Sequence, residues 1–321
     1  MTMYKILISD KLGQAGLERL DAMEDVAYDV RTGLSKAELM AALPEYDALI
    51  VRSGTRPDAE IIAAGAKLKV IGRAGMGVDN VDVTAATRHG VLVMNTPRAN
   101  SVATAEQTMA LMLAAARHIA PAHNSLAAGE WARAQFMGME LDGKTLGVIG
   151  FGYIGRLVTK RAQAFGMRVI AHDPYVDAAT AVALDVPLLP LPDLLAQADV
   201  ITLHSIATPE TLNLINAETI AQMRDGVIIV NVARGKLIDE QALANALQSG
   251  KVAAAALDVF QQEPPHGSPL IGLPNVVHTP HLGASSREAQ HRVGVEIVEQ
   301  VVDALRGADF RNAVNPDAMA R

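Results

Sequence analysis

The sequence predicts an α/β protein with two doubly wound parallel-sheet domains, the first of them discontinuous. Short apolar runs such as "KILIS", "ALIV" and "LGVIG" alternate from end to end with Ala-rich helical stretches such as "SKAELMAAL" and "DEQALANALQSG". Apolar strands that alternate with helices are typical of parallel sheets covered on both faces. We count about eleven strand candidates, more than one open sheet usually holds, so two sheets are expected.

The strand candidates can be taken in chain order. They are "KILIS", "VAYDV", "ALIV", "LKVIG", "VLVMN", "LGVIG", "RVIAH", "DVITLH", "GVIIVN", "VAAAALDV" and "NVVH". Helices expected between the early strands are "AGLERLDAM", "PDAEIIAAGA" and "VDVTAATRHG". Half of the residues are apolar but only 3% are aromatic, so we expect cores built mainly from aliphatic side chains.

Two long helices divide the chain. The first is expected over residues 100–120, after the break at Thr96 and Pro97, and the second begins near "SSREAQHRVGVEIVEQVVDALRG". They bracket the middle of the chain in the way that the two crossings of an inserted domain do. We therefore expect a first domain made of residues 1–98 and 284–321, and a second domain made of residues 99–283.

Composition excludes several classes of protein. The chain has no cysteine, which excludes disulfides, thiolate nucleophiles and Cys-based metal sites, and we expect no metal site. The 28 basic residues against 35 acidic ones give a net charge of −7, which argues against nucleic acid as a partner. No apolar run approaches the ~18 to 20 residues of a membrane span, and "MTMYKILISD" reads as a strand rather than a signal peptide. We expect a cytoplasmic protein with no membrane partner.

A glycine-rich turn predicts a dinucleotide site in the second domain. Gly150, Gly152 and Gly155 form G-x-G-x-x-G directly after an apolar strand and at the start of a helix, and Asp173 ends the next strand. The glycines permit a tight turn, a close approach of the backbone to a pyrophosphate, and close packing of helix and strand. The helix N-terminus favours the anion, and Asp173 can accept hydrogen bonds from a ribose. No Arg follows Asp173 in "DPYV", so NAD is favoured over NADP.

A second glycine-rich segment is interpreted differently. "KVIGRAGMGVDN" places Gly72, Gly75 and Gly77 after a strand, but the spacing does not match the dinucleotide motif. The next strand, "VLVMN", ends in Asn95 rather than in an acid. We therefore expect this segment to form a substrate-side loop of the first domain.

Three residues that can do chemistry each follow a different strand. Arg234 follows "GVIIVNVA", Glu263 lies in "DVFQQEPP" and His281 lies in "TPHLGAS". Each, taken alone, is also typical of an exposed loop. Together, downstream of a dinucleotide motif, they suit redox at a C–OH/C=O centre: His281 as acid–base, Glu263 to orient it, and Arg234 to hold a carboxylate. The small Gly283 leaves room beside the imidazole for nicotinamide and substrate.

These motifs also carry a family resemblance. "VIGFGYIG", "NVARGKLIDE", "ALDVFQQEPP" and "PHLGAS" resemble the D-2-hydroxyacid dehydrogenase family. "LIVRSGT", "VIGRAGMGVDNVD", "VMNTPRANSVATAE", "FMGMELDGKTLG" and "NAVN" are closer still to its D-3-phosphoglycerate dehydrogenase branch. The resemblance implies two Rossmann-like domains, a flavodoxin-like one for substrate (1–98 and 284–321) and an NAD-binding one (99–283), with the active site in the cleft between them. It also implies a homodimer whose contact involves the 101–140 region.

The resemblance implies the same roles for Arg234, Glu263 and His281, and it extends the set of site residues. The residues expected at the cofactor, besides the three glycines of the turn, are Tyr153, Ile154, Asp173, Ser205, Ala233, Arg234, Asp258, His281 and Gly283. Two positions depart from the family pattern: Met76 replaces a more usual Thr or Val, and Ser205-Ile206 replaces Thr-Pro. Both changes are expected to alter packing around the nicotinamide without removing the function.

A second anion on the substrate would need cations of its own. Arg52 ends "ALIV" and Arg73 ends "KVIG", and we expect both at the substrate. The complete set of residues expected there is Arg52, Ser53, Gly54, Arg73, Gly75, Asn100, Arg234 and His281, with Asn100 the weaker candidate. Arg133 is a candidate across a dimer, although Gln135 stands where a nearby basic residue is common in relatives. His204, His278 and His291 are interpreted as structural.

The sequence therefore predicts an NAD-dependent D-2-hydroxyacid dehydrogenase that acts on 3-phospho-D-glycerate in serine biosynthesis. One alternative is the same chemistry on another small anionic acid, such as glyoxylate, hydroxypyruvate or sulfolactate. A remote alternative is an NAD-sensing corepressor, because C-terminal-binding-protein corepressors share the Arg, Glu and His; the disordered tails usual in such proteins are not expected here. Because the chain stops soon after its last helix, we expect a short form that lacks the regulatory domain of many relatives and feedback by serine through it.

Overall fold

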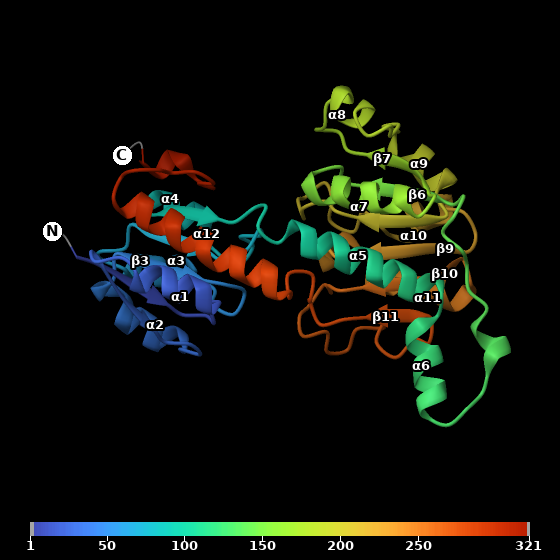
Figure 1. Ribbon diagram of the computed structural model, residues 1–321, viewed down its shortest axis with the longest axis horizontal. Helices are drawn as coiled ribbons and strands as arrows, with labels where there is room; N and C mark the ends of the chain where they lie inside the picture. Colours follow the sequence, from blue (N-terminus) through green and yellow to red (C-terminus); the bar gives the residue numbers. More distant parts are fainter. Residues whose placement is uncertain (1–2, 320–321) are drawn as a thin grey trace. The chain divides into compact units, whose positions relative to one another are not determined.

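The computed structural model describes residues 3–319 and divides into two compact units. Unit 1 consists of the chain up to Ser101 together with the chain from Ala284 onward, and unit 2 is Val102–Gly283. The blue and red ends of the chain accordingly belong to one body in Figure 1, while unit 2 is formed by the segment between them. Unit 2 is thus an insertion into unit 1.

Unit 1 is built on a five-stranded parallel sheet with the order β2-β1-β3-β4-β5. This is the order of a flavodoxin-like doubly wound sheet. The strands are β1 (Tyr4–Ile8), β2 (Val26–Val30), β3 (Ala48–Val51), β4 (Val70–Arg73) and β5 (Leu92–Asn95). All four residues of β3 are buried, as a central strand covered on both faces requires.

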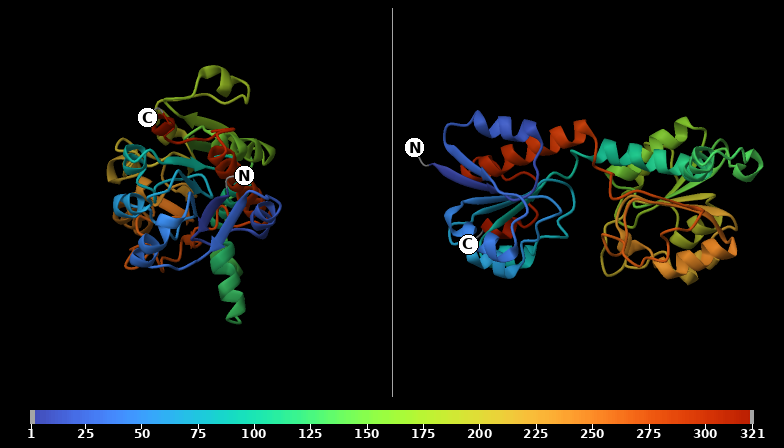
Figure 2. Two further views of the ribbon diagram at one scale, coloured as in Figure 1. Left: turned by 90° about the vertical axis from the view of Figure 1, so that its left-hand side faces the viewer. Right: turned by 90° about the horizontal axis from the view of Figure 1, so that it is seen from below.

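Helices cover both faces of the sheet of unit 1 (Figure 2). The helices are α1 (Gln14–Asp21), α2 (Lys36–Ala42), α3 (Ala59–Ala64), α4 (Val83–Arg88) and α12 (Arg287–Leu305), with short 3-10 helices η1 (Leu43–Glu45) and η4 (Pro316–Met319). α1 and α12 pack on one face, where Ile297 and Val301 enter the core. α2, α3 and α4 pack on the other face, through Leu39 and Ile61 among others.

Unit 2 is built on a six-stranded parallel sheet with the order β11-β10-β9-β8-β6-β7. The strands are β6 (Thr145–Ile149), β7 (Arg168–His172), β8 (Val200–Leu203), β9 (Val227–Asn231), β10 (Val252–Leu257) and β11 (Val276–His278). β7 and β8 lie on opposite sides of β6. The direction of winding therefore changes at β6, and such a switch point is where doubly wound sheets bind ligands.

The helices of unit 2 also form two layers. They are α5 (Ser101–Ala116), α6 (Ile119–Ala127), α7 (Tyr153–Ala164), α8 (Ala178–Val182), α9 (Leu191–Gln197), α10 (Ala217–Gln222) and α11 (Glu240–Ser249), with η2 (Arg133–Phe136) and η3 (Gly235–Leu237). Side chains of α5 and α7, such as Met112 and Val158, pack on one face of the sheet. Side chains of α9, α10 and α11, such as Leu194 and Leu243, pack on the other.

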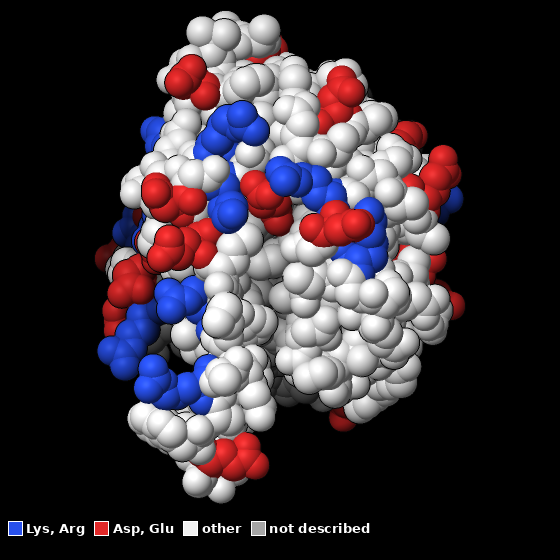
Figure 3. All heavy atoms as spheres, turned by 90° about the vertical axis from the view of Figure 1, so that its right-hand side faces the viewer, with Lys and Arg blue, Asp and Glu red and all other residues white. Residues whose placement is uncertain are grey.

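α6 and the segment that follows it form an arm that stands away from the body of unit 2 (Figure 1). No residue of α6 is buried. Large apolar side chains of the arm are exposed instead, most of all Trp131 (77%) and Met137 (86%). Figure 3 shows acidic and basic side chains interspersed over part of the face turned to the viewer, beside a broad area that carries almost no charged side chain.

The fold class predicted from the sequence is confirmed, and each of the proposed apolar runs overlaps a strand of the structure. One helix differs from the expectation. The helix predicted over residues 100–120 ends at Ala116, because His118 adopts a left-handed backbone conformation (φ 52°) and α6 begins after it. Within residues 3–319, no helix combines the length and apolarity that crossing a bilayer requires.

Candidate active site

The turn between β6 and α7 has the geometry that its glycines predict. Gly150 has a positive φ of 92°, and a Cβ there would lie 2.6 Å from the carbonyl carbon of His204. A Cβ on Gly155 would lie 2.3 Å from the carbonyl oxygen of Gly150, so this glycine lets α7 pack against the turn. A Cβ on Gly152 would meet no protein atom within 4 Å. Gly152 therefore faces open space at a helix N-terminus with no side-chain cap, which fits a pyrophosphate.

Asp173 is fixed beside this turn. Its Oδ2 accepts a hydrogen bond from the backbone N–H of Phe151 at 2.8 Å, and its Oδ1 accepts one from the N–H of Tyr175 at 2.9 Å. A carboxylate oxygen has two lone pairs, so both oxygens keep an acceptor site for a ribose hydroxyl. The partly exposed side chain is thus suited to the role expected of it.

The segment after β8 closes the other side of the turn. A Cβ on Gly150 would also lie 2.7 Å from the backbone nitrogen of Ser205. The neighbouring His204 has its Nε2 3.0 Å from the Oγ1 of the buried Thr202. Burial lowers the pKa of His204 to about 3, so the ring is neutral near pH 7. These contacts agree with a structural role for His204.

Asp258 organises the loop that carries His281. Its side chain is fully buried, and its carboxylate accepts hydrogen bonds from the N–H of Leu282 and of Gly283, each at 2.7 Å, and from the hydroxyl of Thr279. Its carbonyl oxygen accepts the N–H of His281 at 2.9 Å. The carboxylate of Asp258 thus lies beneath the loop, and the contact with the cofactor that the sequence predicts for this residue stays a prediction.

His281 and Glu263 form a hydrogen-bonded pair on this loop and the preceding one. The Nδ1 of His281 lies 2.7 Å from the Oε2 of Glu263, and the Oε1 of Glu263 accepts the N–H of Phe260 at 3.2 Å. Burial raises the pKa of Glu263, but the hydrogen bond and charge of His281, the Phe260 N–H and the charge of Arg234 together lower it below its usual value. Glu263 is therefore ionised at neutral pH, and because it bonds to Nδ1, the Nε2 of His281 is left for another partner.

Arg234 completes the set expected in unit 2. It follows β9, the neighbour of β10 in the sheet, and its charge acts on Glu263. A Cβ on the next residue, Gly235, would lie 1.8 Å from the carbonyl carbon of Phe260. This close approach brings the Arg234 segment against the segment that carries Glu263. The structure thus gathers Arg234, Glu263 and His281 at one edge of the sheet.

The candidate substrate residues of unit 1 follow neighbouring strands of the other sheet. Val51 and Arg73 are register partners in β3 and β4, so Arg52 and Arg73 emerge at the same edge. Burial lowers the pKa of Arg52, although the charge of Asp10 opposes this. Gly75 has a φ of 148°, and a Cβ there would lie 1.8 Å from the Nη1 of Arg73, so the guanidinium folds over Gly75. Asn100, nearly buried (9%), precedes α5.

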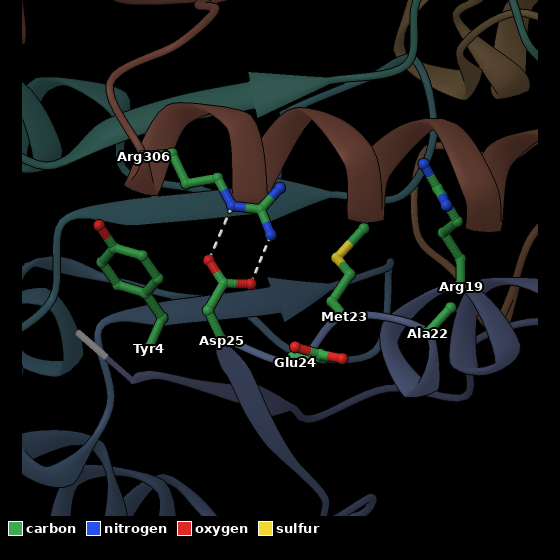
Figure 4. Close-up of a pocket in the computed structure, with 7 residues that line it drawn as sticks. All are labelled: Tyr4, Arg19, Ala22, Met23, Glu24, Asp25 and Arg306. Carbon is green, nitrogen blue, oxygen red and sulfur yellow. Dashed lines mark hydrogen bonds and ion pairs between the residues drawn. The ribbon is translucent and has the colours of Figure 1, made fainter. Parts of the chain in front are cut away.

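A shallow hollow in unit 1 lies elsewhere (Figure 4). It is lined by Tyr4, Arg19, Ala22, Met23, Glu24, Asp25 and Arg306. Tyr4 begins β1 and Asp25 precedes β2, so this hollow is at the amino ends of the strands, opposite the residues described above. Its two arginines are already paired, Arg306 with Asp25 and Arg19 with Glu299. Among the described residues there is also no group of three or more His, Asp or Glu that could hold a metal.

The sequence model of a protein family matches this site. The model describes the NAD-binding domain of the D-isomer-specific 2-hydroxyacid dehydrogenases, and it matches residues 109–283. That stretch includes the glycine turn, Asp173 and the three candidate catalytic residues. The expectation of NAD as the cofactor is thereby confirmed.

Individual proteins are also similar to this chain. D-3-phosphoglycerate dehydrogenase of Methanocaldococcus jannaschii is 51% identical over 98% of the chain, and that of Synechocystis sp. is 48% identical over all of it. The chain spans 60% and 58% of the length of these two relatives, respectively. The crystal structure of a glyoxylate reductase from Paecilomyes thermophila is 33% identical, with a TM-score of 0.89, over 98% of this chain and 99% of that one.

The second and third glycines of the turn, Gly152 and Gly155, should respond differently to an added methyl group. Gly152→Ala should leave the melting temperature unchanged but weaken NAD binding about 10- to 100-fold, since overpacking by a methyl costs about 1–3 kcal/mol and here only the ligand meets it. Gly155→Ala should lower the melting temperature, because the methyl meets the Gly150 carbonyl. Calorimetric titration with NAD and thermal unfolding of both variants check this. Equal effects of the two variants on stability would contradict it.

Proposed function

The chain belongs to the D-isomer-specific 2-hydroxyacid dehydrogenases, and from this we propose that it is an NAD-dependent oxidoreductase that interconverts 3-phospho-D-glycerate and 3-phosphohydroxypyruvate. The observation that carries the proposal is the His281–Glu263 pair at 2.7 Å, with Arg234 beside it, in the same unit as the glycine turn. A base, an oriented ring and a cation are the groups that oxidation of a 2-hydroxy acid needs.

The roles follow from the contacts. NAD, when bound, supplies the acceptor for the hydride that leaves the substrate carbon. The Nε2 of His281 takes the hydroxyl proton in oxidation and returns it to the carbonyl oxygen in reduction. Glu263, ionised and bonded to Nδ1, holds the ring in one orientation and balances the charge it acquires. Arg234 binds the substrate carboxylate and polarises the neighbouring carbonyl.

The phosphorylated substrate is proposed on two grounds. Relatives about 50% identical over nearly the whole chain are D-3-phosphoglycerate dehydrogenases. In addition, Arg52 and Arg73 lie at the carboxyl edge of the unit 1 sheet, and Arg234 alone would suffice for a two-carbon keto acid. The second candidate is reduction of glyoxylate or another small keto acid, which the likeness to a glyoxylate reductase favours.

We also propose that two copies of the chain associate through the arm of unit 2. The exposed Trp131, Met137, Ile119 and Leu126 lie in or near α6. Exposed apolar side chains gathered in one segment of the chain mark an interaction site, and burial against the same arm of a second copy would cover them. This is the expected dimer contact in the 101–140 region.

The arm is tested by the mass of the protein in solution. Wild-type chain at micromolar concentration should sediment as a dimer, and Trp131→Glu combined with Met137→Glu should sediment as a monomer, because each substitution would bury a charge in the contact. Val182→Glu is the matched control, since Val182 is 76% exposed but lies in α8. A monomeric wild-type chain, or a control that dissociates equally, would refute the contact.

Removal of the His281 imidazole should reduce kcat by on the order of 10² or more, the scale of general acid–base catalysis. NAD affinity should change little. Glu263→Gln should reduce kcat less than Glu263→Ala does, because the glutamine side chain retains an acceptor for the imidazole ring of His281. Steady-state kinetics of keto-acid reduction check both, with His278→Ala, at the exposed end of β11, as the control. Near-wild-type turnover of His281→Ala would overturn the assignment.

The substrate is tested by NADH oxidation against a panel of 2-keto acids that includes 3-phosphohydroxypyruvate and glyoxylate. A charge-assisted contact to phosphate contributes roughly 1.5–3 kcal/mol, so Arg52→Ala should reduce kcat/KM for the phosphorylated acid about 10- to 100-fold. It should reduce kcat/KM for glyoxylate much less. If the wild-type protein turned over glyoxylate as fast as the phosphorylated acid or faster, the assignment of the phosphorylated substrate would be refuted. The assignment of the dehydrogenase reaction would not be affected.

A further inference from the structure

The four-residue loop Arg52–Thr55 is held from both sides by two side chains that come from other parts of unit 1. It follows β3 and contains Arg52, the residue proposed above to bind the substrate phosphate. The side chains that hold it are Asp10, which follows β1, and Asn80, which lies between β4 and α4. Both act on the same two residues, the first and the last of the loop.

Asp10 binds the N–H groups of the loop. Its Oδ2 accepts hydrogen bonds from the backbone N–H of Arg52 at 2.6 Å and of Thr55 at 3.0 Å. Its Oδ1 accepts one from the hydroxyl of Thr55 at 3.1 Å. The loop lies so close that a Cβ on Gly54 would be 2.6 Å from Oδ1. The carboxylate is thus occupied by the loop beneath which it lies.

Asn80 binds the carbonyl groups of the same two residues. Its Nδ2 donates hydrogen bonds to the carbonyl oxygen of Arg52 at 2.7 Å and to that of Thr55 at 2.6 Å. Asp10 and Asn80 therefore fix the peptide groups at both ends of the loop through complementary atoms. We call this arrangement, Asp10 and Asn80 around Arg52–Thr55, the loop clamp.

The middle of the loop is left free by the loop clamp. Ser53 and Gly54 are exposed, and within residues 3–319 neither of their N–H groups has a hydrogen-bond partner. Arg52 is partly desolvated, which lowers its pKa, and over the same described residues its guanidinium forms no ion pair with a carboxylate. Exposed N–H groups beside a guanidinium that forms no ion pair are suited to binding an anion.

We infer that Asp10 and Asn80 are positioning residues that hold Arg52–Thr55 in the conformation that binds the second anion of the substrate. This inference rests on the proposed function. Neither residue offers the anion a positive group of its own, and both act through the backbone of the loop. Because a misplacement of about 1 Å can cost up to about 10²-fold in rate, loss of either residue should weaken use of the phosphorylated substrate.

Asp10 can also act through its charge, and the two effects have opposite signs. A carboxylate near Arg52 opposes the binding of an anion, so removal of the charge alone should strengthen binding. Removal of the loop clamp should weaken it. Asp10→Asn separates the effects: its amide oxygen can accept both N–H groups, and its NH₂ can donate to the Oγ1 of Thr55. Asp10→Ala removes charge and hydrogen bonds together.

The experiment measures KM and kcat of each variant with 3-phosphohydroxypyruvate and with glyoxylate. Asp10→Ala and Asn80→Ala should raise KM for the phosphorylated acid about tenfold or more, with kcat and the KM for glyoxylate changed less than threefold. Asp10→Asn should keep KM at or below the wild-type value. Equal decreases in KM for Asp10→Ala and Asp10→Asn would show that charge alone acts, and would overturn the inference.

Asp47→Ala is the matched control. Asp47 precedes β3, at the opposite end of the strand from the loop, and its carboxylate likewise accepts a backbone N–H, that of Lys5 at 3.0 Å. This variant should lose stability as the others do but keep its KM for the phosphorylated acid. A rise in KM that matches that of Asp10→Ala would show that Asp10 affects KM only through the general stability of unit 1, and would overturn the inference.

Hydrogen exchange separates this inference from the proposed substrate. The amides of Arg52 and Thr55 should exchange faster in Asp10→Ala and Asn80→Ala than in the wild type, and at the wild-type rate in Asp47→Ala. If the alanine variants exchanged faster but the wild-type protein did not use the phosphorylated acid, the proposed substrate would be refuted and the loop clamp would be supported. Unchanged exchange in both alanine variants would refute the loop clamp itself.

Discussion

The parallel direction of the strands is the constraint on which the rest of the molecule depends. When all strands of a sheet run the same way, their carboxyl ends meet at one edge, and each loop that leaves this edge lies beside the loops of neighbouring strands. In unit 2 this brings together the glycine turn after β6, Arg234 after β9 and Glu263 after β10. Unit 1 gathers Arg52 and Arg73 by the same geometry.

An aspartate at the end of a strand stabilises the neighbouring loop in three places. Asp10, Asp173 and Asp258 each lie directly after a strand or one residue beyond it, and each accepts a backbone N–H from a segment of another strand's loop. A carboxylate can accept several N–H bonds at once, and loop N–H groups have no partner in the sheet. Beyond the end of each strand, the aspartate carboxylate therefore accepts N–H groups that a neighbouring strand would accept within the sheet. These hydrogen bonds stabilise the loops that carry the candidate site residues.

The strands, the glycine turn and the neighbourhood of Arg234, Glu263 and His281 could be predicted from the sequence, because apolar runs and motif spacing are local signals. The hydrogen-bond partners could not. Only the folded chain shows that the carboxylate of Asp258, a residue expected at the cofactor, binds the N–H groups of Leu282 and Gly283. No local pattern marks Asn80, because the two carbonyl groups that it binds lie 28 and 25 residues away in sequence. The break at His118 depends on one left-handed residue that propensity does not indicate.

The insertion of unit 2 into unit 1 has a consequence for how the chain is made. Helix α12 supplies one face of the unit 1 core, with Ile297 and Val301 fully buried, yet it is synthesised after the whole of unit 2. While the ribosome translates the insertion, β1, β3 and β4 have emerged but lack the helix that covers them. Domains generally fold as they emerge, so unit 2 can be folded while β1, β3 and β4 still lack α12. The N-terminal strands of a nascent chain with this topology therefore remain prone to aggregation until α12 has been synthesised.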